Sequence, residues 1–69
     1  MAIGDRVKAL PGQGCTDESG VLYYNEGHEG VVSSIDADTC TITWEETGKS
    51  TMIRKRAWMK KFIKAPTLL

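Results

Sequence analysis

Turn-forming residues divide the first 48 residues of this 69-residue chain into short segments. They cluster at 11–20, 25–27, 36–38 and 47–48. Glycine and proline favour turns because glycine tolerates positive φ and proline lacks a backbone donor. No amphipathic run in the chain is long enough for a full helix. These interruptions predict an all-β protein of four or five short strands.

Alternation of polar and apolar side chains predicts the individual strands. The clearest lies at 39–45, where Cys40, Ile42 and Trp44 fall on one face and threonines on the other. A charged and apolar alternation at 5–10 predicts the first strand, which Pro11 ends. Further strands are predicted at 29–35, 49–54 and 59–64, and 21–24 suits a short additional strand at the far side of the first loop.

A sheet made of so few residues has a thin core and two exposed edges, and closure into a barrel removes the edges. We therefore predict one domain over 1–69, a single five-stranded antiparallel barrel with its core in 4–64 and a tail at 65–69. A long first loop spans 11–26, and 55–58 suits one 3₁₀ turn before the last strand. The expected core residues are Val7, Ala9, Val31, Ile35, Ile42, Trp44, Ile53 and Phe62.

Two short motifs resemble those of known small barrels. Residues 4–7 (Gly-Asp-Arg-Val) with 27–32 (Gly-His-Glu-Gly-Val-Val) resemble the opening of KOW-type and related SH3-like (Src-homology-3-like) barrels. Residues 42–48 resemble the following strand and turn of Tudor-like, Mind bomb/Herc-type and photosystem-barrel domains. The resemblance covers about 4–64 and implies an SH3-like barrel. The loop at 11–26 is longer than its counterpart in KOW motifs.

Charge is distributed unevenly along a chain whose formal net charge is zero. Residues 1–48 contain all nine acids and only two cations, for a net charge of −7, whereas 49–69 contain seven cations and no acid. Adjacent strands can interleave the two signs, so the sequence leaves the spatial arrangement open.

Residues with catalytic or metal-binding chemistry do not form a recognised site. His28 is the only histidine and no nucleophile motif accompanies it. The acids at 36–38 and 45–46 lie in predicted turns and lack the spacing of a metal-binding loop. Gly12 and Gly14 lack the third glycine and the helix of a phosphate-binding loop. We expect no catalytic residue, metal or cofactor, and rank a small oligomeric enzyme as the least favoured hypothesis.

Aromatic and acidic residues near the long loop are the first candidate ligand surface. In SH3-like and Tudor-like domains, aromatics there pack on proline-rich or methylated cationic segments. The resemblance therefore implies a noncatalytic module that docks a protein or peptide. In the alternative interpretation, Trp44 is a core residue, Trp58 closes one mouth of the barrel and the tyrosines cover the loop. The candidate ligand-binding residues are Asp17, Glu18, Tyr23, Tyr24, Trp44 and Glu46.

A basic strip near the C-terminus is the alternative candidate, for binding nucleic acid or the ribosome. Cations with interleaved aromatics suit phosphate contact and base stacking. Lysines also protect exposed strand edges, and a pI near 6.5 is far below that of a dedicated nucleic-acid-binding domain. The strip comprises Lys55, Arg56, Trp58, Lys60, Lys61 and Lys64.

The expected setting of the protein follows from what the sequence does not contain. No run approaches the roughly 18 apolar residues of a membrane span, and the N-terminal residues do not resemble a signal peptide. Cys15 and Cys40 belong to no metal-binding pair, and we expect both thiols to be free. We predict a cytoplasmic protein without a membrane partner, either a monomer or a weak dimer.

Overall fold

A computed structural model describes residues 2–65 and contains seven strands and one short helix. The protein is all-β, as the sequence predicts. The elements in chain order are β1 (Arg6–Ala9), β2 (Gly14–Thr16), β3 (Leu22–Asn25), β4 (Glu29–Ile35), β5 (Thr39–Trp44), β6 (Ser50–Arg54), α1 (Lys55–Lys61) and β7 (Phe62–Lys64).

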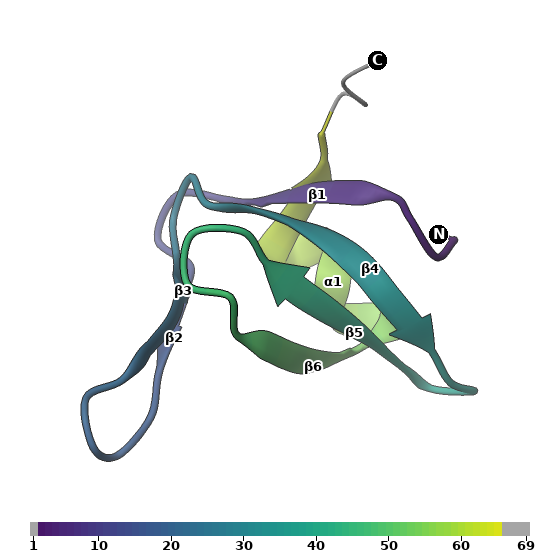
Figure 1. Ribbon diagram of the computed structural model, residues 1–69. Helices are drawn as coiled ribbons and strands as arrows, with labels where there is room; N and C mark the ends of the chain where they lie inside the picture. Colours follow the sequence, from purple (N-terminus) through teal and green to yellow (C-terminus); the bar gives the residue numbers. More distant parts are fainter. Residues whose placement is uncertain (1, 66–69) are drawn as a thin grey trace.

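Five strands form one antiparallel sheet in the order β6-β5-β4-β1-β7, which curls into a half-barrel (Figure 1). Strand β4 joins the two halves of the sheet, and its register against β5 shifts between Val32 and Ser34. Such a bulge bends a strand and increases its twist, which helps the sheet to curl. Strands β2 and β3 form a separate hairpin that projects from the sheet (Figure 1).

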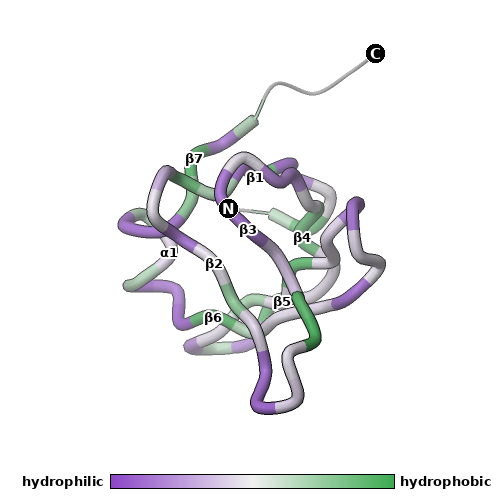
Figure 2. The backbone as a smooth tube through the Cα atoms, turned by 90° about the vertical axis from the view of Figure 1, so that its left-hand side faces the viewer, coloured by the Kyte–Doolittle hydropathy of each residue, from purple (hydrophilic) through white to green (hydrophobic). Residues whose placement is uncertain are grey.

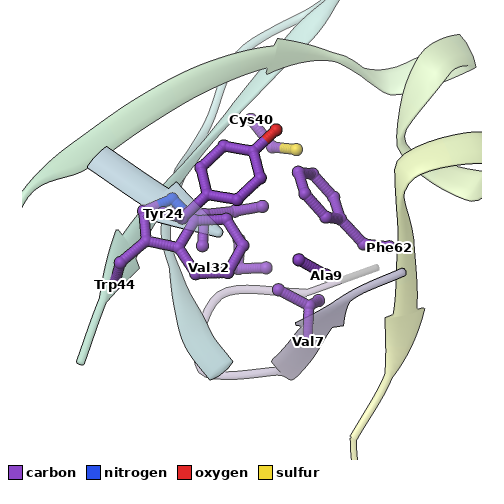
Figure 3. Close-up of a cluster of buried hydrophobic side chains, with 8 residues drawn as sticks. Val7, Ala9, Tyr24, Val32, Cys40, Trp44 and Phe62 are labelled. Atoms are coloured by element: carbon purple, nitrogen blue, oxygen red, sulfur yellow. The ribbon is translucent and has the colours of Figure 1, made fainter. Parts of the chain in front are cut away.

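The concave face of the half-barrel encloses an aromatic core (Figure 3). Tyr24 stacks on Trp44 with ring centroids 4.3 Å apart, and Phe62 lies 5.4 Å from Trp44 in a tilted arrangement. Offset and tilted aromatic pairs stabilise a core beyond the area that they bury. The buried apolar residues are Val7, Ala9, Tyr24, Val32, Cys40, Ile42, Trp44, Phe62 and Ala65.

Most of the predicted core is confirmed, but Val31 was assigned to the wrong face. Val31 pairs with Thr43 on the outer face of the sheet, and its neighbour Val32 is fully buried. Strand β4 turns Gly30 and Val32 inward, so the inward residues are offset by one from the predicted set. Ile35 and Ile53 pack against the core without being fully buried.

Gly30 faces inward because no side chain fits there. A Cβ built on Gly30 would lie 2.7 Å from Ile42 Cγ2, 2.8 Å from the Thr43 carbonyl oxygen and 3.0 Å from Trp44 Cε3. The strands β4 and β5 therefore approach each other closely beneath the indole of Trp44.

The helix α1 corrects the prediction of a single 3₁₀ turn at 55–58. It extends over seven residues, so the last strand starts at Phe62 and not at Met59. Its inner side presents Ala57, Trp58 and Lys61, which are partly buried, and Trp58 packs against the core. Three inward residues at helical spacing stabilise a helix that is too short to be recognised by periodicity.

The predicted long loop also contains more structure than expected, since β2 lies within 11–20. Within residues 2–65, no helix has the length and apolar character needed to cross a membrane.

Candidate functional site

The turn between β2 and β3 is held by Asp17. One carboxylate oxygen of Asp17 accepts hydrogen bonds from the backbone N–H of Val21, the backbone N–H of Ser19 and the Ser19 hydroxyl, each at 2.9 Å. These donors, with the Val21 N–H first among them, lower the pKa of Asp17. The predicted ligand residue Asp17 thus has a local role in closing the hairpin.

An exposed apolar pair follows this turn. Val21 and Leu22 are 40% and 39% exposed, and Figure 2 shows their hydrophobic segment beside the hydrophilic tip of the hairpin. Tyr23, the next residue, is partly buried and packs against the core. Because the hairpin has only two strands, it lacks the area to bury both faces.

The turn between β5 and β6 lies against this hairpin. The Thr47 hydroxyl donates a hydrogen bond to the Tyr23 carbonyl oxygen at 2.6 Å. Glu46, which precedes Thr47, is thereby held close to β3. The structure thus brings the segments containing Tyr23 and Glu46 together. We call Glu18, Val21, Leu22, Tyr23 and Glu46 the hairpin surface.

Two predicted ligand residues do not lie on this surface. Tyr24 is 3% exposed and Trp44 is fully buried, and their rings stack in the core. Burial raises the pKa of the Tyr24 hydroxyl, and the Trp44 indole N–H donates to Thr51 Oγ1 at 2.8 Å. The assignment of these two rings to an exposed ligand surface was wrong. Successive residues of a strand face opposite sides, so Tyr23 and Tyr24 cannot share one environment.

An ion-pair cluster joins β1, β4 and the turn after β5, where one cation, Arg6, offsets part of the charge of two acids. The Arg6 guanidinium binds Glu29 at 3.2 Å and also pairs with Glu45. The hydrogen bonds that Arg6 donates to Glu45 and then to Glu29 raise the pKa of Arg6. In the described part of the chain, Glu18 and Glu46 form no ion pair, so the hairpin surface keeps two uncompensated carboxylates.

The basic strip lies mainly on the exposed side of α1. Lys55, Arg56, Met59 and Lys60 all face solvent. Trp58, the aromatic residue of the strip, packs against the core instead, and the neighbouring ring of Phe62, a predicted core residue, is buried. Lys64 lies on β7, 3.8 Å from the carboxylate of Asp5. The structure therefore separates the cations from the rings expected to stack on bases.

A pocket of about 300 Å³ lies where β6 meets α1, and we call it the junction pocket. Two of its lining residues are joined by a hydrogen bond from the Lys55 backbone N–H to the Asp38 carbonyl oxygen at 2.8 Å. None of its three cations forms an ion pair with residues 2–65. Sequence analysis missed Arg54 because it assigned this residue only to a strand. The pocket is lined by Ala37, Asp38, Arg54, Lys55 and Arg56.

Residues with catalytic chemistry lie apart or have structural roles. His28 Nδ1 accepts a hydrogen bond from the Asn25 N–H at 3.1 Å and so helps to close the turn after β3. Cys15 is exposed and Cys40 is buried, and both are free. Burial raises the pKa of the Cys40 thiol, which disfavours the reactive thiolate. No group of three or more metal-ligating side chains occurs among residues 2–65.

In comparisons with known proteins, no family model matches the chain, and no curated protein or solved structure reaches significant similarity to it.

Proposed function

We propose that this chain is a noncatalytic binding module that docks a cationic protein segment on the hairpin surface. The observation that supports this most is the exposed pair Val21 and Leu22 on a projecting hairpin. The same hairpin carries Glu18 and is bonded to the turn that carries Glu46, and neither acid forms an ion pair within residues 2–65. Apolar anchors give binding energy when a partner covers them, and flanking charge selects the partner.

The hairpin is suited to docking because hydrogen bonds hold both its own turn and its position against the sheet. Asp17 closes its turn, and the bond from Thr47 to the Tyr23 carbonyl holds β3 against the main sheet. A preordered surface loses less conformational entropy on binding than a mobile loop does. A partner with lysine or arginine beside an apolar residue fits this arrangement of charge.

A displayed library of random dodecapeptides tests the proposal. Wild-type protein should enrich peptides that combine cations with apolar residues, and the double variant Val21→Ser, Leu22→Ser should lose them. Met59→Ser is the matched control, because Met59 is 76% exposed on α1, away from the hairpin. Enriched peptides that bind the double variant and the wild type equally would refute the site.

The half-barrel also supports a finer proposal about architecture, namely that the domain is an SH3-like barrel. Support comes from the strand order, with β1 between β4 and β7, and from the long β1–β4 connection. We further place the protein in the cytoplasm, because both thiols remain free.

A second candidate function, nucleic-acid binding, is favoured by one observation: Lys55, Arg56 and Lys60 share the exposed side of α1. Phosphate contact without base stacking is the interaction that this side allows. If it binds nucleic acid, affinity for a single-stranded oligonucleotide should fall by about 0.7 log units per contact for each log unit of salt. A flat salt titration would exclude it.

A further inference from the structure

The outer edge of β6 presents backbone groups that lack a partner strand. Within residues 2–65, β6 pairs only with β5, and it lies at the lower border of the sheet in Figure 1. Hydrogen bonds from Trp44 N–H to Lys49 and from Lys55 N–H to Asp38 mark the two ends of this pairing.

These end bonds determine which backbone groups point outward. Antiparallel pairs alternate between bonded and non-bonded, so Thr51 and Ile53 bond to β5, whereas Ser50, Met52 and Arg54 face the free edge. The Arg54 carbonyl is used, since as the N-cap residue it accepts the first bond of α1. Three N–H donors and two carbonyl acceptors remain for an added strand.

The side chains of the same three residues share the outer face of the sheet. Met52 is 66% exposed there, which leaves an apolar contact unused. Arg54 lies two residues further along the strand and lines the junction pocket with Lys55 and Arg56. The free backbone groups, the exposed Met52 side chain and Arg54, which lines the junction pocket, therefore lie along one strand.

We propose that β6 binds an extended segment of another protein by antiparallel strand addition, and that the segment has an acid two residues before an apolar residue. In antiparallel register, the residue opposite Met52 packs on its side chain, and the residue two positions earlier lies opposite Arg54. A carboxylate at that position enters the junction pocket, whose cations have no other ion partner in the described residues. Main-chain bonds supply affinity, and the two side chains supply specificity.

This site is independent of the hairpin surface, because it lies on another strand and selects the opposite charge. If cationic peptides fail to bind the hairpin surface, the proposal for β6 still stands. If no strand adds to β6, the proposal for the hairpin surface still stands.

The test uses ¹⁵N-labelled protein and an acetylated, amidated peptide, Thr-Glu-Thr-Val-Thr-Thr-Ser. Saturating peptide should slow hydrogen exchange of the Met52 and Arg54 amides. The amides of Thr51 and Ile53 already bond to β5 and should change little. A peptide N-methylated at valine, which cannot donate to the Met52 carbonyl, should bind at least several-fold more weakly. Unchanged exchange at Met52 would overturn the proposal.

A charge swap tests the role of the pocket. Replacing glutamate by lysine in the peptide should weaken binding by about three- to tenfold, and Arg54→Glu should reverse this preference. Arg56→Glu serves as a second variant should Arg54→Glu prevent folding. Equal binding of both peptides would refute the acidic partner. Protection of Met52 that rises with protein concentration alone would also overturn the proposal, since a second copy would then occupy the edge.

Discussion

Gly30 is the residue at which the sheet tolerates least change. A Cβ at this position would lie within 3.0 Å of atoms of Ile42, Thr43 and Trp44. The atoms of Ile42 and Trp44 belong to side chains of the core. We expect Gly30→Ala to lower the free energy of unfolding by about 2–4 kcal/mol, because either the strands or the indole must move. Urea unfolding followed by tryptophan fluorescence measures this loss.

Gly14→Ala is the matched control for that prediction. A Cβ on Gly14 would lie 3.2 Å from Asn25 Oδ1, at an exposed side chain that can move away. Its stability should change by less than about 1 kcal/mol. Equal losses in the two variants would mean that the close approach of β4 and β5 is unimportant.

Two buried groups predict destabilisation at alkaline pH. Burial raises the pKa of the Cys40 thiol and of the Tyr24 hydroxyl. In the unfolded chain these groups lose their protons above about pH 8.5 and pH 10, before the folded chain does. The unfolded state then binds fewer protons, so the free energy of unfolding falls as pH rises, by at most about 1.4 kcal/mol per pH unit and group.

Urea unfolding at several pH values between 7 and 11 checks this dependence. Cys40→Ala should remove the decrease in the free energy of unfolding that begins above about pH 8.5. Tyr24→Phe should remove the decrease that begins near pH 10. Both variants lose some stability at every pH, so the decisive quantity is the slope with pH. A slope identical to that of the wild type in both variants would contradict the prediction.

At the scale of elements, one side-chain hydrogen bond joins the hairpin to the main sheet in addition to the packing of Tyr24 in the core. Thr47→Val removes the bond to the Tyr23 carbonyl and keeps the side-chain shape. We expect a loss of about 1 kcal/mol in stability and faster amide exchange in β2 and β3. Thr39→Val is the control, because the Thr39 hydroxyl makes no side-chain hydrogen bond within residues 2–65. Faster exchange throughout the main sheet would show that the bond is not specific to the hairpin.

The strands could be predicted from sequence where one side faces the core and the other faces solvent. Strand β5 shows this clearly, because Cys40, Ile42 and Trp44 alternate with threonines. The face of Val31 could not be predicted in this way, because the inward neighbour is Gly30, which has no side chain to mark the face. The helix α1 was missed because a seven-residue segment shows too few turns for helical periodicity.

The candidate site was less predictable than the fold. The segments of Tyr23 and Glu46 meet through a hydrogen bond between positions 24 residues apart, which no local pattern records. Strand alternation indicates that Tyr23 and Tyr24 face opposite sides, so the burial of one of them could be predicted. Both were nevertheless assigned to the ligand surface because the loop is rich in aromatic residues. The junction pocket depends on how β6 continues into α1, and that geometry appears only in three dimensions.

At the scale of the whole molecule, the charge distribution predicts weak self-association. The hairpin surface is acidic and the exposed side of α1 is basic, so two copies can attract each other at these surfaces. Few large apolar side chains are exposed among residues 2–65, and exposed charges are screened over about 8 Å at physiological salt. We expect a monomer, or a dimer that dissociates as salt rises. Sedimentation at two protein and two salt concentrations tests this, and a dimer stable in high salt would contradict it.

The free edge of β6 could also pair with the same edge of another copy of the protein. Lys49 and Lys55 lie three residues on either side of Met52. If two β6 strands paired antiparallel about Met52, Lys49 just before the strand of one copy would come near Lys55 at the start of α1 in the other copy, and like charges brought close together are destabilising. We therefore expect the charge at the two ends of β6 to disfavour edge-to-edge pairing of identical copies. Modifications that remove the charge of these lysines, such as acetylation, should therefore favour edge-to-edge pairing of β6 and the growth of fibres.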